Sequence, residues 1–415
     1  MRHPVFRYEK YAFAPQGKDL LINFTFHLPP DITFTPQIII RQAAKLVSKI
    51  NPDLLNNLVF HLGLIETLSY WKAACSPQID IQAGALTAEQ TDWWHNLILK
   101  GMGEFFYQNR IDFTVPNFLN LISCTRGHFT SRQIPPDNSK FLTLVGGGKD
   151  SAVALEVIKN NQQALLLNPT PAALEISQIA GIDSPIIVER SIDPKLLQLN
   201  QQGYLNGHTP FSAYLAFLSL LVASLFGFRH IVVANERSSD EANVDYLGHK
   251  INHQYSKTLD FEHSFRGYVA RYISPSLNYF SLLRPLWEIQ IAKIFAQYPQ
   301  YFSTFKSCNV NRKQNSWCGR CAKCLSTFIL LYPFMPQAAI SIFGRDLTKD
   351  NQLSDLLDHL TGKNLPKPFE CVGTIREIKA ALHFPQDLKI LLKDWGHDKF
   401  LPASLKAKLK SLTHV

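Results

Sequence analysis

The feature that most constrains the fold is a glycine-rich joint between an apolar run and an amphipathic stretch, FLTLVGGGKDSAVALEVI, at residues 141–158. The apolar run predicts a buried strand, and the residues after the glycines predict a helix. Consecutive glycines leave the backbone N–H groups bare where the helix begins, and that end of a helix carries partial positive charge. The joint therefore predicts an α/β fold with an anion-binding site at the end of this strand.

The same order of strand and helix is repeated after the joint. ALLLN precedes TPAALEISQIA, SPIIVERS precedes a long apolar helix, and that helix leads to HIVVAN. This alternation predicts a parallel, doubly wound sheet. Ligands of such sheets bind at the carboxyl ends of the strands, so the polar residues there are the first candidates for a site.

The chain of 415 residues is too long for one compact core, and its segments predict three parts. We expect an α+β domain at 1–137, a candidate for substrate binding, the domain with the glycine joint at 138–305, and a helical, cysteine-containing part at 306–415. RQIPPDNSK, at residues 132–140, combines prolines with turn formers and is predicted to be a linker.

The apolar stretch FSAYLAFLSLLVASLFGF, at residues 211–228, is close to the length of a membrane span. We interpret it instead as a central helix of the α/β domain, because a strand follows at once. Thr209 would cap this helix, Pro210 suits its first position and Gly227 suits its end. No membrane association is expected.

The charge balance favours anionic partners. Lys and Arg number 42 against 33 Asp and Glu, a formal net charge of +9. No block of basic residues with interleaved aromatics is present, so we expect a small-molecule substrate and no nucleic acid. The N-terminus shows no signal peptide, and the cysteine spacing does not indicate disulfides, so we expect a cytoplasmic protein.

The glycine joint differs from two well-known phosphate loops. A Walker loop has Ser or Thr directly after the Lys, where this chain has Asp150, and a dinucleotide loop has a third glycine where Ser151 stands. The motif GGGKDS matches the pyrophosphate loop of ATP pyrophosphatases, usually Ser-Gly-Gly-x-Asp-Ser, with Gly146 in place of the first serine. This match predicts an enzyme that binds ATP and releases AMP and diphosphate.

The loop residues then have expected roles. Lys149 would add positive charge, Asp150 would hold magnesium or orient the loop, and Ser151 would cap the helix and donate to a phosphate. The predicted ATP-binding residues are Gly146, Gly147, Gly148, Lys149, Asp150, Ser151 and Asn168, the last at the end of the next strand.

Four of the seven cysteines are clustered in the order C-x9-C-x2-C-x2-C. Close Cys-x-x-Cys pairs bring sulfurs onto one tetrahedral ion, and four thiolates leave no open position for catalysis. We therefore predict a structural zinc ion, with neighbouring Arg320 and Lys323 offsetting the negative charge. An iron–sulfur cluster and a redox pair are the alternatives. The predicted ligands are Cys308, Cys318, Cys321 and Cys324.

Polar residues are dense between the last predicted strand and the cysteines. Their number suggests contacts to a substrate, whereas turn formation and helix capping are the alternative explanation. Arg284 would clamp a phosphate or carboxylate, or else form a salt bridge with Glu288. His208, just before the apolar helix, is a further candidate. The predicted substrate-binding residues are Asn235, Glu236, Asn252, His253, Gln254, Ser256 and Lys257.

In combination, these blocks resemble one family. The residues concerned are GGGKDS, ANE at 234–236, GHKINHQYSK at 248–257, LLRPLWE at 282–288, WCGRCAKC at 317–324 and KPFECVGT at 367–374. They are similar to the ATP-dependent UDP-N-acetylmuramoyl-L-alanyl-L-glutamate epimerases of bacterial cell-wall synthesis. The resemblance covers residues 140–375 and matches nothing specific before them.

The resemblance implies a reaction. The terminal L-glutamate of UDP-MurNAc-L-Ala-L-Glu is converted to D-glutamate while ATP becomes AMP and diphosphate. Adenylation of the glutamate α-carboxylate removes its charge, so that loss of the α-proton gives a stabilisable enolate. His253, His208, Lys257 and Cys371 are candidate acids and bases. The predicted catalytic set is Asp150, Lys149, His253, Lys257, Arg284 and Cys371.

Three alternatives remain open from the sequence. The chain would be a tRNA-modifying pyrophosphate-loop enzyme, a 7-cyano-7-deazaguanine synthase, or a nucleotide-binding zinc protein without turnover. Deazaguanine synthases are much shorter, and RNA binding would weaken steeply with salt. The sequence does not indicate an oligomeric state.

Overall fold

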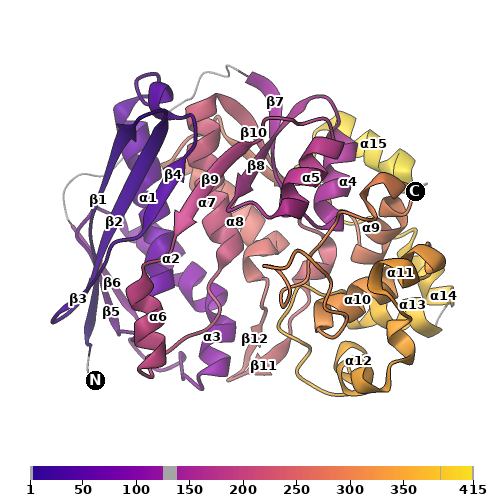
Figure 1. Cartoon of the computed structure of the whole chain (residues 1–415). Coiled ribbons are helices and arrows are strands. Elements are labelled where there is room, and N and C mark those ends of the chain that lie inside the picture. The colour runs from indigo at the N-terminus through magenta and orange to yellow at the C-terminus, as the bar shows by residue number, and fades with distance from the viewer. Residues whose placement is uncertain (1–2, 125–137, 384, 414–415) are drawn as a thin grey trace.

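The computed structural model describes residues 3–124, 138–383 and 385–413 (Figure 1). In these residues an 11-stranded sheet forms the centre of the molecule, and two further strands form a separate hairpin. The strands are β1 (Val5–Gln16), β2 (Asp19–Leu28), β3 (Ile32–Phe34), β4 (Gln37–Ile40), β5 (Gln78–Ile81), β6 (Asn120–Ser123), β7 (Asn138–Leu144), β8 (Gln162–Leu167), β9 (Ile186–Ser191), β10 (Phe228–Val233), β11 (Val244–Tyr246), β12 (His249–Ile251) and β13 (Asn278–Ser281).

The helices of the described residues pack around this sheet and beyond one end of it. The first eight are α1 (Pro52–Trp71), α2 (Ala88–Gly101), α3 (Gly103–Gln108), α4 (Lys149–Ile158), α5 (Pro171–Ile179), α6 (Pro194–Gln201), α7 (Phe211–Phe226) and α8 (Leu259–Tyr272). The others are α9 (Glu288–Phe295), α10 (Ala322–Leu331), α11 (Pro336–Phe343), α12 (Ser354–Leu360), α13 (Ile375–His383), α14 (Pro385–Leu391) and α15 (Ala403–Thr413). Short 3-10 helices include η2 (Arg237–Asp240) and η3 (Tyr255–Lys257).

The sheet has the strand order β13-β10-β7-β8-β9-β4-β2-β1-β5-β6, with β3 paired to β2. Pairs from β13 to β9 are parallel, as are β1 with β5 and β5 with β6. β4 pairs antiparallel with both β9 and β2, and β2 pairs antiparallel with β1. The predicted α/β class with a mostly parallel sheet is confirmed.

The parallel half of the sheet is buried on both faces. Successive strand residues point to opposite faces, so Leu165 of β8 joins the core that contains α1 and α7, while Leu166 joins the core that contains α4 and α9. In the antiparallel half, β2 alternates buried and half-buried residues along its length. This difference explains why the later strands are continuous apolar runs and β2 is not.

The strands of the predicted N-terminal domain belong to the same sheet as the glycine joint. β4 pairs with β9 through residues such as Ile38 and Arg190. In Figure 1 the N-terminal strands lie on one side of the molecule and the C-terminal helices on the other. The division at 137/138 stays a prediction and falls within this continuous sheet. The proposed linker lies outside the described residues except for its last three, which belong to β7.

The apolar stretch is the helix α7, packed against α1 and the sheet as expected. Gly227 ends it with a φ of 76°, as predicted. The proposed cap at Thr209 is wrong: the residue before the helix is Pro210, and no side chain caps the first turn. Among the described residues, no helix combines the length and apolarity that crossing a membrane requires.

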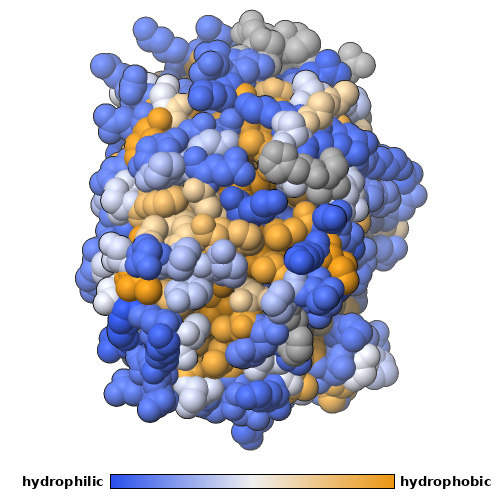
Figure 2. Space-filling model, turned by 90° about the vertical axis from the view of Figure 1, so that its right-hand side faces the viewer, coloured by the Kyte–Doolittle hydropathy of each residue, from blue (hydrophilic) through white to orange (hydrophobic). Residues whose placement is uncertain are grey.

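The C-terminal helices build their own layer against α4 and α9. The face that they form is turned to the viewer in Figure 2, where a broad hydrophobic stretch is framed by hydrophilic residues. Partly buried hydrophobic side chains of this layer pack against the second core. The predicted helical C-terminal part is therefore present, and it is tied to the sheet through α4 and α9.

Candidate active site

The glycine loop connects β7 to α4, and its glycines have different roles. Gly147 has a φ of +91°, and a Cβ there would lie 3.0 Å from the Ala173 nitrogen, so this position requires glycine. Gly148 is the residue before the first turn of α4, where no side chain caps the helix. Gly146 faces open space, with no atom within 4 Å of a Cβ built on it. The first turn of α4 therefore keeps free N–H groups, as an anion site requires.

Ser151 closes the loop. Its Oγ accepts a hydrogen bond of 3.0 Å from the Gly146 N–H. The prediction that Ser151 caps the helix is wrong, because the cap position belongs to Gly148 and Ser151 lies inside α4. The hydroxyl hydrogen remains available to an acceptor in the adjoining cavity, which Ser151 lines.

Lys149 is paired with two carboxylates. Its Nζ donates to Asp150 and Glu288, each at 2.7 Å, and its side chain is buried. Burial alone would lower the pKa of Lys149, but the two carboxylates raise it. Among the described residues, Lys149 is not part of either cavity wall at the loop. Its role in ATP binding stays a prediction that this geometry does not support.

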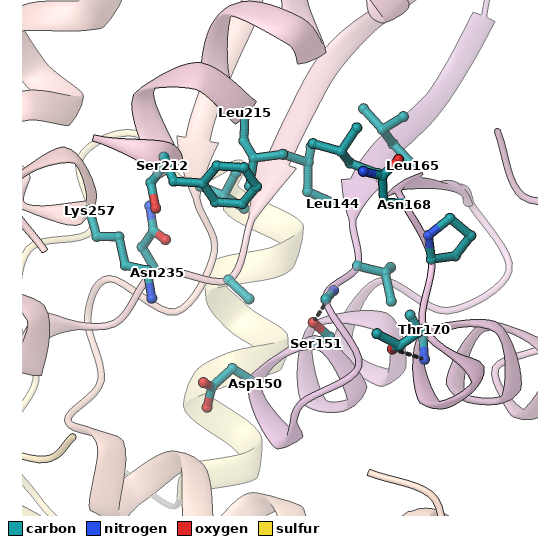
Figure 3. Close-up of a pocket in the computed structure, with 18 of the residues that line it drawn as sticks. Leu144, Asp150, Ser151, Leu165, Asn168, Thr170, Ser212, Leu215, Asn235 and Lys257 are labelled. Carbon is teal, nitrogen blue, oxygen red and sulfur yellow. Dashed lines mark hydrogen bonds between the residues drawn. The ribbon is translucent and has the colours of Figure 1, made fainter. Parts of the chain in front are cut away.

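Two cavities adjoin at the glycine loop. One of 230 Å³ lies over the carboxyl ends of β7, β8 and β10, and the other of 510 Å³ extends toward the cysteine-rich segment. Figure 3 shows Asp150 and Ser151 at the start of α4, with Lys257 and Asn235 entering from another side of the pocket. The two cavities share the wall residues Gly146, Asp150, Ser151, Thr170, Phe211, Ser212, Leu215, Lys257 and Arg312.

A thiol lies in the wall of the larger cavity with positive groups around it. Lys257 Nζ donates to Cys371 Sγ at 3.3 Å, and the nearby His253 ring acts electrostatically on the same thiol. Burial alone would raise the pKa of Cys371, but Lys257 and His253 lower it to about 6. Cys371 is therefore a thiolate at neutral pH, which is the form that accepts a proton.

His253 is held on its other side by a residue that the sequence did not indicate. Its Nδ1 lies 2.5 Å from Glu104 Oε2. Burial alone would lower the pKa of His253, but Cys371 and Glu104 raise it to about 9. The ring of His208 lies next to His253, with centroids 4.4 Å apart. Burial and the neighbouring positive charges lower the pKa of His208 to about 3, so one imidazole is charged and the other neutral.

A second group of charges lies behind the loop. Lys323 Nζ is 3.7 Å from Glu288, which also binds Lys149. Burial alone would raise the pKa of Glu288, but Lys149 and Lys323 lower it to about 2. Lys323 also donates to the Cys371 carbonyl oxygen. Its ammonium group thus contacts both the backbone of Cys371 and the Glu288 carboxylate. The sequence predicted only that it would offset the negative charge of the four clustered cysteines.

Arg284 has a structural place in the site. Its guanidinium donates to Glu262 Oε2 at 3.3 Å, to the Glu236 carbonyl oxygen at 2.7 Å, and to the Lys257 carbonyl oxygen. The proposed salt bridge to Glu288 is wrong, since the acidic partners of Arg284 are Glu262 and Asp240. Arg284 joins the segments that carry Glu236 and Lys257, and its side chain is only 3% exposed. A clamp on substrate stays a prediction that this burial does not support.

Some of the remaining predicted binding residues line the cavities, and others make contacts within the protein. Asn235, Gln254 and Ser256 line the cavities, and the buried Oε1 of Gln254 has no hydrogen-bond partner among the described residues. Asn252 instead accepts from the Gln254 N–H and donates to Ser239, so turn formation explains it. Asn168 lines the smaller cavity while its amide pairs with the backbone of Arg190.

Glu236 lies behind the cavity walls. Its carboxyl is buried, and burial, offset in part by Lys257, raises its pKa to about 7. Asp150, Glu288 and Cys371 are the negative neighbours that contribute to this rise. Glu236 is therefore close to the group formed by Cys371, Lys257 and His253, called the thiol cluster below. Its direct contact with a substrate stays a prediction.

The four clustered cysteines converge as a metal site would require. Sγ–Sγ distances are 3.9 Å for Cys308–Cys321, 3.7 Å for Cys318–Cys324 and 3.5 Å for Cys321–Cys324. Metal–sulfur bonds of about 2.3 Å in a tetrahedron place the sulfurs about 3.8 Å apart. The cluster could hold a metal ion and is compatible with structural zinc.

The segment that leads into the first of these cysteines lies against the glycine loop, and the stretch after it contacts the start of α5. The Lys306 N–H donates to the Gly147 carbonyl oxygen at 2.9 Å, and the Ala172 N–H donates to Asn315 at 3.2 Å. Arg312, which the sequence did not indicate, is in the wall of both cavities. The cysteine-rich segment therefore forms part of the same site.

Fold and site together define an α/β protein with a glycine-loop cavity suited to an anion and a thiol among positive groups beside it. Comparison with known families is more specific: residues 1–282 match the MurL N-terminal domain, and residues 303–413 match the MurL C-terminal domain. The chain therefore belongs to the MurL family.

Curated relatives support this family membership. A protein of Xanthomonas oryzae pv. oryzae is 32% identical over 394 residues, covering 91% of this chain and 84% of the relative. A protein of a Micromonospora species is 32% identical over 403 residues, covering 92% and 86%. Both relatives are named UDP-N-acetyl-alpha-D-muramoyl-L-alanyl-L-glutamate epimerase. No solved structure matches the chain significantly.

Proposed function

We propose that this chain is an ATP-dependent epimerase of peptidoglycan precursor synthesis, which inverts the terminal L-glutamate of UDP-MurNAc-L-Ala-L-Glu to D-glutamate. Membership of the MurL family and the names of the curated relatives support the substrate. The observation that carries the chemistry is the shared wall of the two cavities, where Gly146, Asp150 and Ser151 lie beside Lys257. An activated carboxylate formed at the loop would thus be next to the thiol cluster.

The first step is activation of the glutamate α-carboxylate. A carboxylate oxygen attacks the α-phosphorus of ATP, an acyl-adenylate forms, and diphosphate leaves. The free N–H groups at the start of α4 and the Ser151 hydroxyl are suited to hold phosphate oxygens. These groups support an ATP site of the pyrophosphate-loop type in the smaller cavity. Asp150 would hold magnesium, which would neutralise phosphate charge.

The second step is inversion at the α-carbon. The Cys371 thiolate takes the α-proton, and the resulting enolate of the adenylate is stabilised by the positive groups nearby, Lys257 foremost. A proton then returns to the opposite face of the α-carbon from an acid in the same cavity, for which the charged imidazole of His253 is the candidate, whereas the neutral His208 is not. Water hydrolyses the adenylate to AMP and the D-glutamyl product, which drives the inversion forward.

Two further features fit the proposal. The unpaired Oε1 of Gln254 offers an acceptor to a substrate amide or hydroxyl in the larger cavity. Structural zinc on the four cysteines would fix residues 308–318 over the loop, with Arg312 at both cavities. A guanidinium there suits a departing diphosphate.

The test is the substrate dependence of ATP cleavage. The protein is incubated with ATP and magnesium, with and without UDP-MurNAc-L-Ala-L-Glu, and AMP, diphosphate and D-glutamate are measured. We expect AMP only with the dipeptide substrate and in step with its conversion. ATP binding without AMP formation in the presence of that substrate would instead indicate a nucleotide-binding protein without turnover.

A further inference from the structure

Glu104 is a buried carboxylate from α3 that reaches the wall of the larger cavity through His253. It lies in the N-terminal third of the chain, far in sequence from the other residues of the site. Its side chain is 7% exposed, and one oxygen accepts from Gln108 at 2.8 Å while the other faces His253 at 2.5 Å. A carboxylate in this position favours the charged form of the imidazole.

The interactions lead from Glu104 through His253 to the thiol. Glu104 binds one ring nitrogen of His253, and this ring acts electrostatically on Cys371, which lies in the wall of the same cavity. We propose that Glu104 is a positioning residue, which holds His253 as an imidazolium against the Cys371 thiolate. The N-terminal part of the chain thereby supplies one member of a carboxylate–imidazole–thiol relay. This inference rests on the proposed function, in which the thiolate is the base.

The other charged groups around the relay are consistent with this role. Lys257, Lys323 and Glu236 act on the thiol from η3, α10 and the segment after β10. His208 acts on His253 from the segment before α7, and its ring is neutral. Besides His253, the positive charges of Lys257 and Lys323 favour the thiolate, and the carboxyl of Glu236 opposes it. Among the described residues Glu104 contacts His253, His208 and Gln108, so its effect on the sulfur is exerted through the His253 ring.

The test compares the thiol in wild-type protein, E104Q and E104D. The alkylation rate of Cys371 by iodoacetamide is followed across pH, with the modified peptide identified by mass spectrometry. E104Q removes the charge and keeps the shape, so the alkylation midpoint should rise by at least one pH unit above the wild-type value. E104D keeps the charge at a greater distance and should give an intermediate midpoint. E89Q, the same change at an exposed carboxylate of α2, should leave it unchanged.

Activity provides the second readout. In E104Q, kcat should fall at least tenfold while the KM for ATP stays unchanged. If E104Q does not fold, the E104D midpoint alone decides, because a longer contact must also raise it. An unchanged midpoint in the folded variants overturns the proposal. So does a divalent metal that copurifies with the wild type and is lost in E104Q, since Glu104, His208 and His253 would then be its ligands.

The alkylation experiment is independent of turnover. A wild-type protein with the low thiol midpoint, the expected rise in E104Q and no epimerisation would refute the proposed function and leave the relay standing. Epimerisation with a midpoint insensitive to Glu104 would do the opposite.

Discussion

At the scale of single residues, the glycine loop shows which sequence signals determine backbone geometry. Of its three glycines, only Gly147 combines a positive φ with a close approach to another backbone segment. Gly146, which differs from the usual serine of the motif, has free space around its Cβ position. The departure from the motif therefore removes a hydroxyl group without changing the space that the loop needs.

We predict opposite outcomes for two substitutions in this loop. Gly147→Ala forces a side chain into a left-handed conformation and against the Ala173 nitrogen, which should cost about 1–3 kcal/mol and abolish most ATP binding. Gly146→Ser, the matched control, should bind ATP like the wild type. Isothermal titration calorimetry with ATP and magnesium measures both. Loss of binding in Gly146→Ser would show that the loop has a different shape.

The pH dependence of activity follows from the thiol and the imidazole. Activity requires the Cys371 thiolate, so kcat/KM should fall as pH decreases through about 6. It also requires the His253 imidazolium, so kcat/KM should fall again as pH increases through about 9. A bell-shaped profile between these values is expected when kcat/KM is measured from pH 5 to 10. A flat profile down to pH 5 would exclude the thiolate as the base.

At the scale of elements, the cysteine segment and Arg284 connect parts of the chain that lie far apart in sequence. Residues 306–315 lie against the glycine loop and α5, and Arg284 joins the carbonyl oxygens of Glu236 and Lys257. These contacts position the loop, the thiol cluster and Lys257 relative to one another. Substitutions in the cysteine segment or at Arg284 should therefore alter the geometry of the site.

Loss of a metal ion from the four clustered cysteines should weaken ATP binding. About one metal ion per chain is expected from four thiolate ligands, and Cys321→Ser should lower this content and the affinity for ATP together. Cys124→Ser, at an exposed cysteine outside the cluster, is the control. Metal content by mass spectrometry and ATP affinity by calorimetry test this. Normal ATP affinity in a metal-free protein would separate the cluster from the nucleotide site.

Loss of Arg284 should destabilise the protein strongly. Arg284→Leu leaves the Glu262 carboxylate, which is 2% exposed, buried without its charged partner. The free energy of unfolding should therefore fall by about 3–5 kcal/mol. Arg271→Leu removes an exposed partner of Glu89 and should have a much smaller effect. The free energy of unfolding in urea measures both. Similar small losses in the two variants would show that Arg284 is not structural.

At the scale of the whole molecule, the sequence predicted the parallel sheet, the loop and the cysteine cluster because each is encoded within a short segment. It did not predict that β4 would join β9 and extend the sheet into the N-terminal strands. It also missed Glu104, because a glutamate within a helical pattern carries no local sign that it faces a histidine 149 residues away. The sequence predicts Lys149 at a phosphate and leaves Arg284 between a substrate clamp and a salt bridge to Glu288, because nothing local to them indicates that their partners are Glu288 and Glu262 respectively.

In the proposed mechanism, ATP cleavage and proton exchange occur in one site, and isotope incorporation tests this link most directly. The wild-type protein is incubated in deuterium oxide with ATP, magnesium and UDP-MurNAc-L-Ala-L-Glu, and the product is analysed by mass spectrometry and chiral analysis. We predict D-glutamate with deuterium at the α-carbon, one AMP formed for each inversion, and no exchange without ATP. D-glutamate that retains the original α-proton, or deuterium exchange without ATP, would contradict the account.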